Sequence, residues 1–160
     1  MYVPFDNLPS TARIWIYQAS RLLSDREAAQ VNKAVEVFAT EWSAHNKSLQ
    51  ASGILKHRLF LILGVNESQN KASGCSVDSS VRFVKELETL SGISFLDKMN
   101  VAIRQGADVN VYGADELIDL YKQGHVSDST LTFDNTLNVK EQLQSKWEIP
   151  FSESWLMQRV

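Results

Sequence analysis

The alternation of apolar and polar residues divides the first part of the chain into two segments that favour strands. Residues 13–18 are rich in β-branched and aromatic side chains and predict a strand. Residues 54–65 predict a second strand region, whose second half is apolar at every position, as is typical of a central strand covered on both faces. The polar segment 46–53 before it predicts a loop.

Two further segments repeat their apolar residues at steps of three and four, which is the period of an amphipathic helix. The first predicted helix begins after Ser24, because Ser24 and Glu27 match a capping box, and it continues to about His45. The second ends before Gly92, a residue that suits the left-handed position after a helix. The apolar stripe of this second helix consists of Val77, Val81, Val84, Leu87 and Leu90.

Shorter elements follow in the second half of the chain. They are a hairpin over 101–112, a helix over 114–123, a strand over 130–133 and a helix over 139–147. The tail 147–160 is too apolar for a free end, so we expect it to pack back on the body of the protein or to lie at an interface with a second subunit.

This order of elements predicts an α+β protein with a mixed, mainly antiparallel sheet and helices packed on it. The first part suits a ferredoxin-like core, and a parallel three-layer sheet is the alternative. No repeat or linker divides the chain, and 160 residues can bury a sizeable core, so we expect residues 1–160 to form a single globular domain.

The composition of the chain limits the kinds of binding partner and the cellular compartment that we expect. The net charge of −3 argues against nucleic acid, and the densest basic stretch is only Lys56-His57-Arg58. A single cysteine excludes an internal disulfide and a zinc site built from several cysteines, and it suits a reducing compartment. The first residues do not match a signal peptide, and the longest apolar run is too short to cross a membrane. We therefore expect a cytoplasmic protein without membrane contact.

The candidate for chemistry is Cys75, which lies in a run of small residues where the second predicted helix starts. A helix N-terminus favours the thiolate form, which is the nucleophile in thiol enzymes and redox proteins. Asp78 and His57 are the candidate helpers, His57 only if the strand before the helix brings it close. The alternative is that Cys75 is a small buried residue of the core.

The same helix start suggests a binding site without chemistry. Unpaired backbone N–H groups at a helix N-terminus attract anions, and small residues allow close approach. Ser73, Gly74 and Ser76 are therefore candidate ligand-binding residues within a site spanning Gly74–Ser80.

Signatures of other reactions are missing from the sequence. It contains no GxxxxGK[ST], GxGxxG, GxSxG, HExxH or CxxC pattern, so we expect no metal and no cofactor. Three segments resemble a small uncharacterised bacterial family whose members often carry the label "ABC transporter ATPase". These segments are residues 9–19, 72–78 and 154–156. The resemblance implies no known activity, and without a phosphate-binding loop the chain is not expected to be an ATPase.

Three hypotheses about function follow. The first is a non-catalytic domain that binds a protein partner or forms a homo-oligomer through its apolar C-terminal tail. The second is a thiol-dependent enzyme or redox protein that uses Cys75. The third is a domain that binds an anion or small ligand at Gly74–Ser80.

Overall fold

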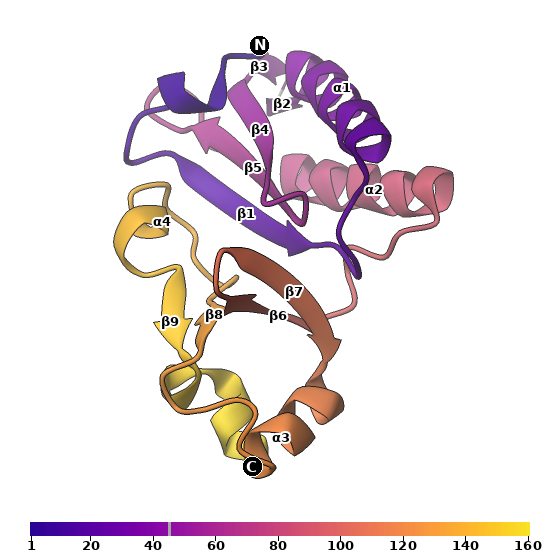
Figure 1. Ribbon diagram of the computed structural model, residues 1–160. Helices are drawn as coiled ribbons and strands as arrows, with labels where there is room; N and C mark the ends of the chain where they lie inside the picture. The colour runs from indigo at the N-terminus through magenta and orange to yellow at the C-terminus, as the bar shows by residue number, and fades with distance from the viewer. Residues whose placement is uncertain (45) are drawn as a thin grey trace.

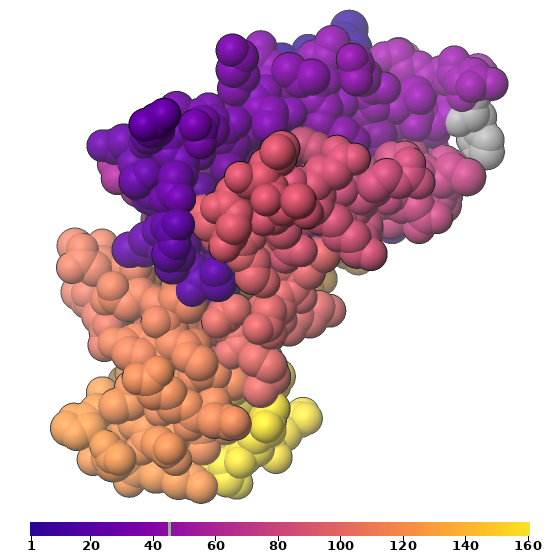
Figure 2. Space-filling view, turned by 90° about the vertical axis from the view of Figure 1, so that its right-hand side faces the viewer, coloured from indigo at the N-terminus to yellow at the C-terminus, as the bar shows by residue number. Residues whose placement is uncertain are grey.

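Two antiparallel sheets lie one above the other between two layers of helices in the computed structural model, which describes residues 1–44 and 46–160 (Figure 1). The first sheet has the strand order β1-β5-β4, the second has the order β7-β6-β8-β9, and β2 and β3 pair in a separate two-stranded sheet. Together they form one compact α+β domain with mainly antiparallel pairing, as predicted. Figure 2 shows the N-terminal half above the C-terminal half, with the end of the chain at the bottom.

The elements follow one another along the chain from an N-terminal lead-in that packs on the first sheet to a row of short C-terminal helices. The strands are β1 (Arg13–Gln18), β2 (Ser43–Ala44), β3 (Lys47–Ser48), β4 (Gln50–Lys56), β5 (Phe60–Asn66), β6 (Asn100–Gln105), β7 (Asp108–Gly113), β8 (Leu131–Phe133) and β9 (Glu148–Pro150). The α-helices are α1 (Asp25–Glu41), α2 (Gly74–Ser91), α3 (Ala114–Lys122) and α4 (Gln142–Ser145). The 3-10 helices are η1 (Phe5–Asn7), η2 (Phe151–Glu153) and η3 (Trp155–Arg159).

The first sheet is covered on one face by α1 and α2. Gly53 of β4 lies directly beneath α1, and a Cβ added there would collide with the side chain of Val35. The ring centroids of Trp15 on β1 and Trp42 at the end of α1 lie 5.6 Å apart. The glycine at position 53 therefore lets α1 approach the sheet closely.

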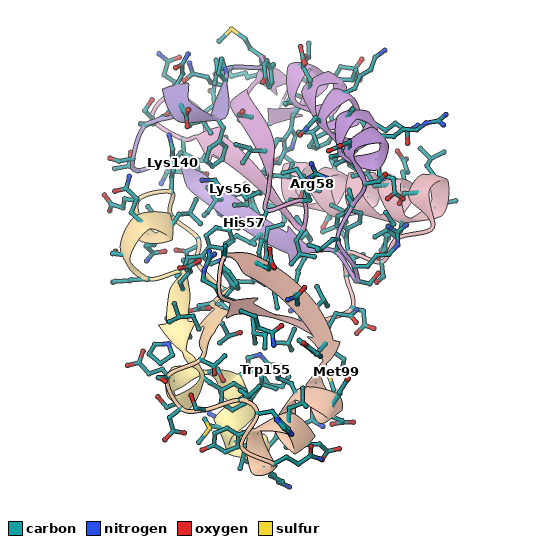
Figure 3. All side chains as sticks on the ribbon, viewed as in Figure 1. Lys56, His57, Arg58, Met99, Lys140 and Trp155 are labelled. Carbon is teal, nitrogen blue, oxygen red and sulfur yellow. The ribbon has the colours of Figure 1, made fainter. Side chains whose placement is uncertain are left out.

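The N-terminal lead-in covers part of the other face. Beside Gly64 of β5, a Cβ would come within 2.7 Å of Leu8, so the lead-in also packs directly on the backbone of the sheet. The ammonium group of Lys140 donates hydrogen bonds to the carbonyls of Phe5 at 2.9 Å and Leu8 at 2.7 Å (Figure 3). Lys140 thus fixes η1 to the second half of the chain.

The two sheets meet through an aromatic cluster and a chain of polar side chains. Phe60 on β5 lies 4.7 Å from Phe133 on β8 and 4.8 Å from Trp147, measured between ring centroids. The indole N–H of Trp147 donates to Asn135 at 3.0 Å, and Asn135 donates to Gln18 at 3.2 Å. Because these polar groups are directional, they fix how the sheets are aligned while the rings supply the buried apolar contact.

The largest difference from the sequence prediction concerns the strand region 54–65. It is not one strand but the hairpin β4–β5, and part of the predicted loop 46–53 belongs to β3 and β4. The hairpin turns at His57 and Arg58, whose φ angles are both +54°. The signal was missed because neither residue is a glycine or asparagine, which normally occupy such positions.

Helix boundaries agree with the capping signals and differ where those signals are absent. The capping box of Ser24 and Glu27 starts α1, and Gly92 with a φ of +70° ends α2, both as predicted. The first helix ends at Glu41 instead of continuing to His45, which lies outside the described residues. Leu90, predicted to lie on the buried stripe, is 84% exposed. Of the helix predicted over 139–147, only α4 is α-helical.

The second half builds its own small core on the outer face of the second sheet. The hairpin β6–β7 forms as predicted around Gly106. Phe151 and Leu156 from the C-terminal tail are fully buried against this hairpin and α3. The first sheet pairs antiparallel in the order β1-β5-β4 with α1 and α2 on one face, as expected for the split arrangement at the start of a ferredoxin-like core, and the alternative of a parallel three-layer sheet is wrong. Among the described residues, no helix combines the length and the apolar character needed to cross a membrane.

Candidate functional site

The start of α2 is organised by two serines. Ser73 is the N-cap, and its hydroxyl accepts from the backbone N–H of Ser76 at 3.1 Å, while the hydroxyl of Ser76 accepts from the N–H of Ser73 at 2.6 Å. The indole of Trp42 donates to the carbonyl of Ser76 at 2.9 Å, which ties this turn to the end of α1. The two serines predicted as ligand-binding residues therefore bond to each other as a helix cap.

Cys75 lies in the first turn of α2, and its side chain is exposed. Asp78, one turn further along, is exposed as well. A Cβ on Gly74 would meet no atom within 4 Å, so this glycine is not required for a close approach within the protein. The alternative that Cys75 belongs to the core is therefore wrong, and its thiol is accessible to solvent.

His57 lies far from this thiol. It occupies the β4–β5 turn, next to the start of α1, where the N–H of Leu23 donates to the carbonyl of Arg58 at 2.9 Å. The 17 residues of α1 then span about 25 Å before Trp42 reaches the start of α2. The structure therefore brings together Cys75 with Ser73, Gly74, Ser76 and Asp78, and it separates His57 from all of them.

His57 and Arg58 instead line an open groove where the two sheets meet, which we call the junction groove. Its volume is about 490 Å³. The lining residues come from the segment before α1, from the β4–β5 turn and from the start of β7. They are Leu22, His57, Arg58, Ala107, Asp108, Val109 and Asn110. Figure 3 labels His57 and Arg58 at the level of the first sheet, above β7.

The turn that lines the groove holds its backbone in an unfavourable conformation. Left-handed φ angles at two successive non-glycine residues are uncommon and cost free energy. The ring of His57 lies 6.0 Å from that of Trp147, between centroids. Partial burial lowers the pKa of His57, as do the positive charges of Arg104 and Lys56, while Glu148 opposes them. The neutral imidazole of His57 is therefore favoured. The positive charge on this side of the junction groove comes from Arg58.

A second feature lies at the other end of the second sheet, on the C-terminal tail. Trp155 is 46% exposed and Met99 is 40% exposed. The guanidinium of Arg159 lies 6.0 Å from the centroid of the Trp155 ring and 3.8 Å from the sulfur of Met99. We call these three residues the C-terminal surface, and Figure 3 labels Met99 and Trp155 beside α3.

The junction groove was not predicted from the sequence, because it depends on three segments that are distant along the chain. The signal that pointed toward it was the polar run Lys56-His57-Arg58 inside an otherwise apolar stretch. Within the described ranges, no three or more His, Cys, Asp or Glu residues are grouped so that they could hold a metal ion.

Comparison with known proteins adds no relative. No family model, no curated protein sequence and no solved structure matches the chain.

Proposed function

We propose that the protein is a non-catalytic interaction domain that binds a partner protein through its C-terminal surface. The observation that supports this proposal is the exposed side chain of Trp155 between two fully buried anchors. Phe151 and Leu156 are 0% exposed, so they hold the backbone on both sides of Trp155 in place.

The residue types of this surface are those that contribute most to protein interfaces. Tryptophan and arginine are enriched among the residues that dominate binding energy, and methionine is enriched at interfaces in general. Arg159 lies near both Trp155 and Met99 and pairs only loosely with Asp115, at 3.4 Å between exposed side chains. Such a pair costs little to break, so the guanidinium is free to take a carboxylate of the partner.

The exposed thiol of Cys75 supports a thiol-dependent enzyme as the second candidate. Against it, the described residues gathered at the start of α2 include neither His57 nor His125, so neither of these two histidines can serve as the base that activates the thiol. The proposed location is the cytoplasm, because an accessible unpaired thiol persists best in a reducing compartment.

Anion binding at Gly74–Ser80 is the third candidate. Against it, Ser73 and Ser76 are already bonded to each other.

The test uses the variant Trp155→Ala and a matched control, Val37→Ala, which removes an exposed apolar side chain from α1. Each protein is immobilised and exposed to a lysate of the cells that produce it, and each is also examined by sedimentation equilibrium. We expect a partner or an oligomer that is retained by the wild type and by Val37→Ala but lost with Trp155→Ala. A monomeric wild type with the same bound proteins as Trp155→Ala would contradict the proposal.

A further inference from the structure

The outer edge of β7 is open. In its sheet β7 pairs only with β6, and no other backbone segment in the described part of the chain donates to it or accepts from it. An unpaired strand edge is a template for another strand, and proteins usually protect it with proline, lysine or a short length. The six residues of β7, Asp-Val-Asn-Val-Tyr-Gly, include neither proline nor lysine.

The hairpin register identifies which groups the open edge presents. The two-residue turn makes Gln105 and Asp108 the closing pair of the β6–β7 ladder. In an antiparallel hairpin of this kind the hydrogen-bonded pairs alternate from the closing pair onward. Asn110 therefore bonds to β6, whereas the backbone N–H and C=O groups of Val109 and Val111 face away from it.

The junction groove runs along the start of this edge. One wall is formed by residues 107–110, which include the carboxylate of Asp108, and Leu22, which is 43% exposed, lies on the other wall with His57 and Arg58. The second wall thus offers the apolar side chain of Leu22 and the positive charge of Arg58. Arg58 ends the densest basic stretch of a chain whose net charge is −3.

We propose that the junction groove binds an extended peptide that adds a strand to β7 and places a carboxylate side chain against Arg58. Strand addition supplies backbone hydrogen bonds, and the side chains of the groove supply the preference for sequence. Arg58 is available because its partner Asp25 is exposed and the pair is solvated, with side-chain exposures of 56% and 85%. The strained conformation of the turn holds Arg58 at the groove, as expected of backbone strain at a functional position.

This site is distinct from the C-terminal surface. The groove lies at the Asp108 end of β7, whereas Met99 bonds to Ala114 beyond the opposite end, through its carbonyl at 2.8 Å. The two proposals can therefore fail separately, and Trp155→Ala is expected to leave peptide binding unchanged.

The first experiment uses two synthetic peptides, Thr-Val-Glu-Val-Thr-Val and the same sequence with Lys in place of Glu. Each is titrated into the ¹⁵N-labelled full chain and followed by the amide resonances. We expect the Glu peptide to bind about tenfold more tightly than the Lys peptide. We also expect the amides of Val109 and Val111, but not that of Asn110, to become protected from hydrogen exchange. Absence of any change at β7 with either peptide would overturn the proposal.

Two variants separate the parts of the site. Val111→Pro removes an outward N–H while keeping the ladder to β6, and Val111→Thr is its matched control. We expect about tenfold weaker binding of the Glu peptide for Val111→Pro only.

Arg58→Gly fits the left-handed turn and gives a second test if the proline disrupts the strand. We expect this variant to keep the contact between the peptide and β7 but to bind the Glu and Lys peptides with about equal affinity. A preference that survives in Arg58→Gly would refute the role of Arg58. Protection of Val109 and Val111 without peptide, rising with protein concentration, would identify a second copy as the occupant and overturn the peptide proposal.

Discussion

Replacing Arg58 with glycine should stabilise the protein, although it removes a charged side chain and an ion pair. Arg58 has a φ of +54°, and its guanidinium pairs with Asp25 at the surface. Glycine adopts this φ without strain because it has no Cβ. The substitution therefore tests whether the turn stores unfavourable backbone energy.

Three contributions decide the magnitude. A left-handed conformation costs a non-glycine residue roughly 1–2 kcal/mol, which the substitution recovers. Glycine makes the unfolded chain more flexible, which costs roughly 0.4–1 kcal/mol. Loss of an exposed ion pair costs about 0–1 kcal/mol. With the middle of each range, the expected net effect is a stabilisation of about 0.3 kcal/mol.

The assay is urea unfolding at neutral pH, with the change in free energy taken from the midpoint at constant slope. Gly92→Ala provides the reverse perturbation, because Gly92 has a φ of +70° and an added Cβ would meet no atom within 4 Å. Its expected cost is about 1 kcal/mol, because backbone strain of roughly 1–2 kcal/mol is partly offset by the lower flexibility of the unfolded chain. Destabilisation of Arg58→Gly by more than about 1 kcal/mol, with the expected loss for Gly92→Ala, would refute the reasoning.

Three further predictions concern charge, the core and the thiol. The pKa of Glu27 is lowered to about 2 from its usual 4.5, chiefly by the hydrogen bond from Arg21 and then by the backbone of Ser24. Its stabilising effect is thus present above pH 4.5 and lost as the pH falls toward 2, so Glu27→Gln should unfold in acid with a shallower pH dependence than the wild type over that range. Leu156→Ala should lower the free energy of unfolding by about 2–5 kcal/mol in urea, because its side chain is fully buried; a loss below about 0.5 kcal/mol would contradict this core packing. Cys75 should react with iodoacetamide in the native protein as fast as after unfolding, since it is exposed, and a thiol silent before denaturation would contradict its placement.

Elements specified by neighbouring residues were predictable from the sequence. The capping box at Ser24 starts α1, Gly92 ends α2, and Gly106 turns the β6–β7 hairpin, all where the sequence signals place them. Each signal depends on residues within about four positions, so local conformational preference suffices. The strand over 13–18 also matches β1 at both ends.

The candidate sites depended on the tertiary structure. His57 and Arg58 form a turn without the usual turn residues, because pairing of β4 and β5 over seven residue pairs outweighs the backbone cost there. Exposure likewise does not follow from the local sequence, since Cys75 in its run of small residues is exposed, whereas Leu156 beside the exposed Trp155 is buried. By itself the sequence determined the helix caps, the class of fold and the absence of familiar catalytic motifs. Which side chains meet at the junction groove and which remain exposed was decided only by the stacking of two sheets, because those contacts join residues as far apart as Leu22 and Asn110.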